Sequence, residues 1–293
     1  MRETKEGDMQ TNLFNYTTLS TRLEKSTRTL FVTLNRPDWN NSFRLEMLFE
    51  LESLLAWCTS KVEINTIFFD SCSPLFSTGL ELTQLSSLSA NQLDKINTKL
   101  HKIIFAMMQL PQTIVMDLGK GSQTIASEFA LGADIRIADQ DGKMSFNHCK
   151  YGLVPAAGGM SMLSTLVSPV FARSWILSGE DIDSKALKSS GLIQTTYSSE
   201  NKQETISNLL VRIAEQAPVQ RIQAKLGLFE ALRNQFENGI VMDRKIAKAS
   251  MVSEDWKTRK EQSSEVSFMP AKSMSYSVKL SLIKSENMGT IEH

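Results

Sequence analysis

The chain has 293 residues, and its 32 Lys and Arg residues balance 32 Asp and Glu residues, so its formal net charge is zero. This balance removes the electrostatic argument for a nucleic-acid partner or for attraction to an anionic membrane. Hydrophobic residues make up 41% of the chain and charged residues 22%. These values are typical of a folded globular protein and exclude a disordered chain.

Cysteine and histidine usage narrows the class of site. The three cysteines, Cys58, Cys72 and Cys149, are odd in number and widely spaced. This pattern argues against a disulfide framework and against a zinc knuckle, and it favours a reducing compartment. Because the chain has only three histidines, a multi-histidine metal site is not expected, and we predict no metal.

No segment has the pattern of an export signal or of a membrane span. Residues 1–16 carry charges of both signs and lack an apolar core. The longest apolar run, 103–108, is much shorter than the roughly 20 residues that span a bilayer. We therefore expect a soluble, cytoplasmic protein without membrane insertion.

The first part of the chain alternates strand-like and helix-like segments. A β-rich segment at 29–34 ends at a turn signal, and residues 16–23 are a candidate hairpin partner for it. Apolar residues then recur at helical spacing between 45 and 55. A short apolar run at 64–69 predicts the next strand.

A long amphipathic helix is predicted after a serine-rich loop. Ser89 and Gln92 have the spacing of a capping box, and apolar residues recur at helical spacing from 93 to 107. Pro111 ends this helix, and the segment 113–116 begins another strand. The β-α-β-α-β order predicts a mostly parallel sheet with helices on its faces, an α/β fold.

Helical patterns dominate after Ile193. The segments 199–216, 219–238 and 241–262 all have helical spacing, and Pro218 and Gly239 separate them. An α/β body followed by a helical C-terminal region is therefore expected.

The end of the chain has a different character. Residues 263–293 are rich in serine and lysine, but apolar residues alternate between 276 and 282. A strand, a contact with a partner subunit and a loose polar tail all fit this pattern. We divide the chain into an α/β core at 1–195, a helical region at 196–262 and a tail extension at 263–293.

Three segments lie where a predicted strand runs into a loop or into the start of a helix. They are 76–82, 119–134 and 151–159. The carboxyl ends of the strands in a parallel sheet form the edge at which such folds bind ligands. We therefore expect the functional site to be built from these segments.

At these positions the chain resembles the crotonase (enoyl-CoA hydratase/isomerase) superfamily, in order and spacing, from about residue 20 to about residue 260. The matching motifs are Leu34-Asn35-Arg36-Pro37 with Asn41, then 76–82, 128–135, 152–159, 177–193 and Ala217-Pro218-Val219. The resemblance implies a spiral of β-β-α units with a helical C-terminal region. It also implies a homotrimer or a hexamer, with 196–262 as the trimerisation region.

The resemblance implies an acyl-CoA thioester as the partner, with CoA as part of the substrate and no separate cofactor. Two backbone N–H groups, which map to Thr78 and Ile125, would form an oxyanion hole for the thioester oxygen. Ile125 lies at a helix start, where the dipole favours negative charge. The implied substrate contacts are Gly79 and Gly158, with Asn35 and Asp38 near the adenine-ribose end of CoA.

The acid/base residues follow from the same resemblance. Hydratases of this family use two glutamates twenty positions apart, and Glu128 coincides with the first. His148 stands where the second glutamate is expected. Hydration needs two cooperating titratable groups, which a Glu128 and His148 pair can supply, because histidine titrates near neutrality. Isomerisation, in which a proton moves between Cα and Cγ, needs only one.

Two further departures concern the loops. Where hydratases carry three glycines before the first glutamate, this chain has Thr124-Ile125-Ala126, so the Ile125 side chain either crowds a ligand or shields the site. The acidic residue of the first loop is Glu81 here, a mild change.

The structural interpretations of these residues stay open beside the functional ones. Glu128 also suits the first turn of a helix, where the dipole favours a carboxylate, and His148 also suits a packed position. Cys149 follows His148 on a presumed strand and would point to the opposite face, which argues against a thiol nucleophile. We expect His101 to be structural, and Gly158 to form a turn as well as any ligand contact.

The sequence therefore predicts an enzyme that acts as an enoyl-CoA hydratase or enoyl-CoA isomerase in fatty-acid metabolism. One alternative is a crotonase-fold protein that has lost catalysis and serves as a binding or assembly module. Another keeps catalysis but changes the reaction to thioester hydrolysis, decarboxylation or dehalogenation.

Overall fold

The computed structural model describes residues 13–258, and its strands form two sheets. The strands are β1 (Leu19–Glu24), β2 (Thr29–Leu34), β3 (Thr66–Ser71), β4 (Thr113–Asp117), β5 (Gly121–Gln123), β6 (Ile135–Asp139), β7 (Lys143–Ser145), β8 (Ile182–Asp183) and β9 (Thr195–Tyr197). The larger sheet has the order β1-β2-β3-β4-β6-β9, and the smaller sheet joins β5, β7 and β8.

Helices cover the sheet on both faces and form most of the C-terminal region. The α-helices are α1 (Leu45–Cys58), α2 (Leu82–Leu85), α3 (Ala90–Gln109), α4 (Thr124–Leu131), α5 (Leu163–Leu166), α6 (Pro169–Ser178), α7 (Ser184–Ser189), α8 (Lys202–Ala214), α9 (Pro218–Ser250) and α10 (Asp255–Thr258). The 3-10 helices are η1 (Pro37–Trp39), η2 (Asn147–Tyr151) and η3 (Met251–Ser253). Within residues 13–258, no helix combines the length and the apolar character that crossing a membrane requires.

The strand pairing confirms the predicted α/β fold. β1 pairs antiparallel with β2, as the hairpin prediction required, and β2, β3, β4, β6 and β9 run parallel. The central strands are apolar on both faces, as expected for a sheet covered twice. On one face Phe68, Val115 and Ile137 pack against α8, and the opposite face packs against α1, α3 and α4 in the main core.

The predicted capping box is also present. The Ser89 side chain accepts from the Gln92 N–H, and the Gln92 side chain accepts from the Ser89 N–H, at the start of α3. Both exchanges satisfy backbone donors that the first turn of a helix leaves without internal partners.

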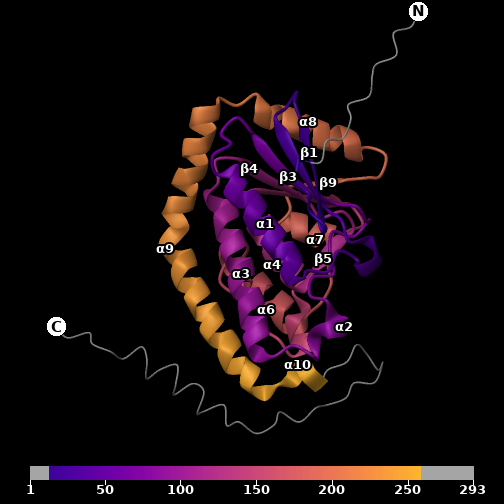
Figure 1. Cartoon of the computed structure of the whole chain (residues 1–293), viewed down its shortest axis with the longest axis vertical. Coiled ribbons are helices and arrows are strands. Elements are labelled where there is room, and N and C mark those ends of the chain that lie inside the picture. The colour runs from indigo at the N-terminus through magenta and orange to yellow at the C-terminus, as the bar shows by residue number, and fades with distance from the viewer. Residues whose placement is uncertain (1–12, 259–293) are drawn as a thin grey trace, which may run out of the picture.

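The helical C-terminal region differs from the sequence prediction at Gly239. A single 33-residue helix, α9, runs through this glycine and along the side of the molecule beside α3 (Figure 1). A Cβ on Gly239 would lie 2.4 Å from Cβ of Ser161. The glycine therefore permits close packing in mid-helix and does not end the helix.

The prediction of one helix over 241–262 is also wrong, because α9 ends at Ser250 and is followed by η3 and α10. The last four residues of that segment and the tail extension, 263–293, lie outside the described residues, with the alternation at 276–282. Phe229, Phe236 and Trp256 of the C-terminal helices belong to the same buried cluster as the sheet residues.

An acidic cluster lies at the carboxyl ends of the parallel strands, beneath α8. Asp117 of β4 accepts from the Tyr197 hydroxyl, and its other oxygen lies 2.9 Å from Lys202 Nζ. Asp70 of β3 is partly buried, and its Oδ1 has no hydrogen-bond partner in the described part of the chain. Burial, with the negative charge of Asp117, raises the pKa of Asp70 to about 6.

We therefore expect Asp70→Asn to stabilise the protein at pH 7. Because the pKa of Asp70 is higher in the folded state than the unfolded value of about 3.9, its ionisation lowers the free energy of unfolding as pH rises through about 4 to 6. Urea unfolding at pH 7 should show a gain of about 1 kcal/mol, after allowance for the partial exposure of Asp70. At pH 4 the gain should vanish, and a gain of equal size at both pH values would contradict this account.

Candidate active site

The structure brings the two predicted acid/base residues together. Glu128 lies on α4 and His148 on η2, both side chains are fully buried, and Glu128 Oε1 is 2.9 Å from His148 Nε2. Despite this distance, neither Oε1 nor either ring nitrogen of His148 makes a hydrogen bond of acceptable geometry within the described residues. Buried polar atoms without hydrogen bonds are costly, so they mark a candidate functional pair.

The other oxygen of Glu128 is held by backbone amides of a single loop. Oε2 accepts from the N–H of Ala157 at 2.7 Å and from the N–H of Gly159 at 2.8 Å. A Cβ on Gly159 would lie 2.8 Å from Glu128 Oε2 and 2.6 Å from Cβ of Pro155, so this position requires glycine. One oxygen is therefore fixed, and the other is left to face His148.

The neighbouring Gly158 has the turn role that the sequence analysis also considered. Its φ of +113° favours glycine, and its carbonyl oxygen accepts from the Met162 N–H at 2.7 Å. The cradle formed by Ala157 and Gly159 was not predicted, because every residue except proline carries a backbone N–H.

Ile125 occupies the second position of α4, as the oxyanion prediction assumed. N–H groups in the first turn of a helix have no internal partner, and the helix dipole there favours negative charge. The Ile125 side chain is 1% exposed and lines a small cavity together with His148.

The backbone contacts of Thr78 argue against it as the oxyanion donor that the sequence analysis paired with Ile125. The Thr78 N–H donates to the carbonyl oxygen of Asn40 at 3.1 Å, so it is already committed. The Leu80 N–H is the better candidate, because Leu80 lines the same cavity as Ile125 and His148. Its acceptor in this structure is a side-chain hydroxyl, Thr124 Oγ1, at 3.1 Å.

Thr124 fills the space beside this loop. Its φ of +45° lies in the left-handed region, which branched residues rarely adopt. Its hydroxyl accepts from Leu80 and donates to the carbonyl oxygen of Thr78 at 3.3 Å. Gly79 has φ +81°, and a Cβ there would lie 1.9 Å from Thr124 Oγ1. Gly79 thus makes room for Thr124, and its own N–H donates to Ser77 Oγ.

The cavity beside Glu128 and His148 is nearly closed. Its volume is about 10 Å³, at the lower limit for one water molecule. The lining includes the C-terminal end of α9 and the start of η3. The lining residues are Leu80, Leu93, Asn97, Ile125, His148, Leu153, Val154, Ala247, Ser250 and Met251. Trp256, which follows η3, is 1% exposed and donates from Nε1 to the carbonyl oxygen of Leu88. This hydrogen bond holds the end of the C-terminal helices beside the cavity.

The predicted CoA segment lies at the surface beside this loop. Asn35 and Asp38 are exposed, and Arg36 between them is buried. Arg36 Nη2 and Arg44 Nε each lie 3.2 Å from Glu81 Oε2. Glu81 therefore has a structural part here, since it ties the segment at 35–38 to the loop that contains Leu80.

His101 and Cys149 are not part of this pair. His101 makes an edge-to-face contact with Phe105 on α3, and burial together with the charges of Arg244 and Lys102 lowers its pKa to about 4. Cys149 is exposed on η2, so the presumed strand at this point is wrong. In the described part of the chain, no three His, Cys, Asp or Glu side chains are grouped as a metal ion would require.

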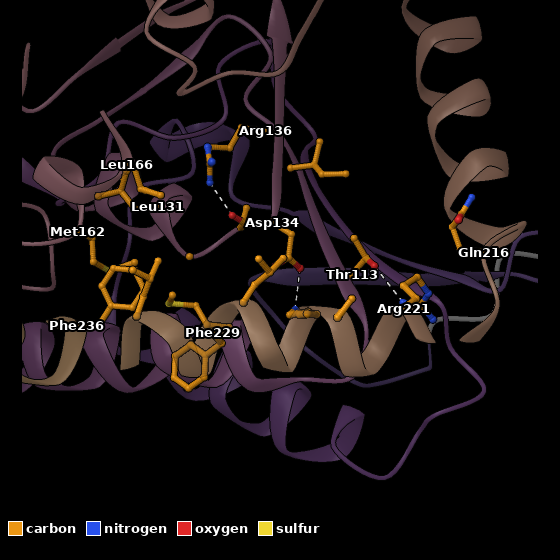
Figure 2. Close-up of a pocket in the computed structure, with 18 of the residues that line it drawn as sticks. Thr113, Leu131, Asp134, Arg136, Met162, Leu166, Gln216, Arg221, Phe229 and Phe236 are labelled. Carbon is orange, nitrogen blue, oxygen red and sulfur yellow. Dashed lines mark hydrogen bonds and ion pairs between the residues drawn. The ribbon is translucent and has the colours of Figure 1, made fainter. Parts of the chain in front are cut away.

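A much larger groove lies elsewhere, between α9 and the ends of α4 and β6. Its volume is about 710 Å³, and among the described residues none of the predicted site residues lines it. Figure 2 shows Phe229, Phe236 and Met162 at one end and Arg221 near Thr113 at the other. Arg221 Nη1 donates to Asn65 O at 2.8 Å and to Thr113 Oγ1 at 3.0 Å, so it fastens α9 to the sheet.

The comparisons with known proteins agree with this architecture. The 2,3-dehydroadipyl-CoA hydratase of Escherichia coli is 21% identical over 235 residues, which cover 80% of this chain and 91% of that protein. The trans-2-decenoyl-[acyl-carrier-protein] isomerase of Streptococcus mutans is 22% identical and covers 62% of this chain and 71% of its own length. The crystal structure of enoyl-CoA hydratase from Bacillus halodurans superposes with a TM-score of 0.77 at 20% identity, over 83% of this chain and 98% of that one.

The sequence also matches a protein family as a whole, which supports the resemblance that its motifs suggested. Residues 24–269 match the family described as enoyl-CoA hydratase/isomerase, which is most of the chain. The chain therefore belongs to the enoyl-CoA hydratase/isomerase family, the crotonase superfamily.

Proposed function

We propose that the chain acts on an enoyl-CoA thioester through an enolate, by isomerisation or hydration, with Glu128 as the acid/base. The observation that carries this proposal is the buried pair of Glu128 and His148, with one Glu128 oxygen held by two amides and the other left to His148. A carboxylate fixed in this way is held in one orientation, as a general acid/base within hydrogen-bond reach of its substrate needs to be.

The two reactions use these groups differently. In isomerisation, Glu128 Oε1 removes a proton from Cγ of the acyl chain, the double bond shifts, and the same proton is returned to Cα. In hydration, one member of the pair takes a proton from water as the water oxygen bonds to Cβ, and the other gives a proton to Cα, so His148 serves as the second proton carrier. In both, the N–H groups of Leu80 and Ile125 stabilise negative charge on the thioester oxygen, once the Thr124 hydroxyl has moved away from Leu80.

The substrate side of the proposal rests on the family resemblance. CoA is part of the substrate, and its adenine-ribose end is assigned to the exposed segment with Asn35 and Asp38. Opening of the segment at Ala247, Ser250 and Met251 admits the acyl chain, because the present cavity holds one water molecule at most.

A second candidate function is favoured by the closed cavity. Thr124 accepts from the Leu80 N–H, where a thioester oxygen would bind, and the cavity lined by Ile125 and Met251 is only about 10 Å³ in volume. Both features suit a binding or assembly protein without catalysis. Thioester hydrolysis and decarboxylation remain alternative reactions of the same site.

One assay separates these candidates. Wild-type protein is incubated with trans-2-enoyl-CoA substrates from short to long chains, and the loss of enoyl-thioester absorbance is followed, with product identification by mass spectrometry. Turnover supports the enzyme and the product identifies its reaction. The absence of both turnover and acyl-CoA binding at millimolar ligand contradicts the proposal and supports the assembly protein.

We further propose self-association as a homotrimer or hexamer through the groove of Figure 2. Leu228 of α9 lines this groove and is 74% exposed, so it offers an apolar side chain to a partner. Leu228→Glu is expected to convert the assembly to monomers in sedimentation velocity. Leu177→Glu is the matched control, because Leu177 on α6 is 78% exposed and does not line the groove. An unchanged assembly in the Leu228 variant would contradict this arrangement.

A further inference from the structure

A second buried carboxylate lies close behind the Glu128 cradle. Asp243 of α9 is 3% exposed, and its Oδ2 accepts from the Ser161 N–H at 3.1 Å and from the Ser161 hydroxyl at 2.8 Å. No residue of the sequence analysis pointed to it, because α9 is long and carries many charged residues.

The same short loop serves both carboxylates. The N–H groups of Ala157 and Gly159 hold Glu128, and the N–H of Ser161, two residues further on, holds Asp243. Gly239 lies one helical turn before Asp243, and its missing Cβ lets α9 approach Ser161. The loop is therefore clamped between α4 and α9, with one carboxylate on each side.

From this geometry we propose that Asp243 is a positioning residue for Glu128. It holds the loop at 157–161 against α9 and so fixes the two amides that orient the Glu128 carboxylate. The inference rests on the proposed function, because it assumes that the orientation of Glu128 matters for proton transfer.

Burial of the Asp243 carboxylate is unfavourable for stability, which supports a role for this residue beyond stability. Burial, with a smaller contribution from the charge of nearby Glu128, raises the pKa of Asp243 to about 6, so the carboxylate is held in the core at a cost in stability. α9 also supplies Ala247 and Ser250 to the cavity lining. Asp243 thus links the helix that covers the cavity to the loop that holds Glu128.

The test uses the full chain with three variants. Asp243→Ala removes the oxygen that accepts both hydrogen bonds from Ser161, and Asp243→Asn keeps one acceptor oxygen. Asp94→Ala is the matched control, since Asp94 of α3 lies 3.6 Å from Arg244 and 3.5 Å from Lys248 of α9 and does not contact the loop. Hydrogen exchange of the peptide that covers 155–163 is measured together with kcat and KM.

In Asp243→Ala we expect exchange at the Ala157 and Gly159 amides to rise about tenfold. We expect kcat to fall about 10- to 100-fold with KM within about twofold, because a small misplacement of a reacting group has effects of that size. Asp243→Asn should recover most of kcat, and Asp94→Ala should change neither readout.

The two readouts separate this inference from the proposed function. Unchanged exchange in Asp243→Ala overturns the inference whether or not the protein turns over enoyl-CoA. Increased exchange with unchanged kcat also overturns it, since Glu128 then works without the clamp. If wild-type protein shows no turnover, the proposed function fails, while exchange still tests whether Asp243 holds the cradle.

Discussion

Glu128→Gln is expected to lower kcat for enoyl-CoA turnover by about 10²- to 10⁴-fold, the usual contribution of general acid/base catalysis. The amide oxygen of glutamine can still accept from Ala157 and Gly159, so the cradle can form as it does around Glu128 Oε2. The amide cannot take up or release a proton at the position that faces His148. Stopped or continuous absorbance assays with the substrate panel measure the loss.

Two further variants accompany Glu128→Gln. One changes His148, the other member of the pair, and one changes a glutamate outside the pair. His148→Gln separates the two reactions: isomerisation needs one proton carrier and should lose little, whereas hydration should lose about as much as in Glu128→Gln. Glu46→Gln, on α1, should keep full activity, because Glu46 is distant in sequence from the pair and contacts the Thr17 hydroxyl. A Glu128→Gln protein that is folded and fully active would exclude Glu128 as the acid/base.

The fold could be predicted from the sequence because burial imposes a period on the chain. The strands β2, β3 and β4 and the helices α1 and α3 carry apolar residues at strand or helix spacing, and the Ser89 capping box gives the start of α3. Gly239 was misinterpreted for a physical reason. Glycine ends helices and also permits close packing inside them, and only the Ser161 contact distinguishes the two uses.

The candidate site could be predicted only where side chains carry it. Glu128 and His148 were found as a pair, and the structure places them 2.9 Å apart. The donors that surround them are backbone N–H groups, which every residue but proline has. The chain path alone decides that the Thr78 N–H is committed to Asn40 and that the Leu80 N–H faces Thr124.

Thr124 is the departure from the family pattern with the clearest physical consequence. The family resemblance implies glycine at this position, and the left-handed φ of +45° is one that glycine adopts without strain. A threonine there places a hydroxyl on the Leu80 N–H, where it competes with a thioester oxygen for the same donor. Because the hydroxyl belongs to the same chain as the Leu80 N–H, it lies beside that donor at any protein concentration.

Thr124→Gly is therefore expected to raise kcat/KM for an enoyl-CoA about 10- to 100-fold, because a single oxyanion-hole donor contributes a factor of about 10² to 10³. Stability should change by about 1 kcal/mol or less, since relief of the left-handed strain offsets the lost hydrogen bonds of the hydroxyl. Thr124→Ser is the matched control, because it keeps the hydroxyl beside Leu80 and should remain close to wild type. If the glycine and serine variants have equal activity, the hydroxyl does not compete for Leu80. If only the glycine variant is active, wild-type Thr124 is what separates this chain from a working enoyl-CoA site.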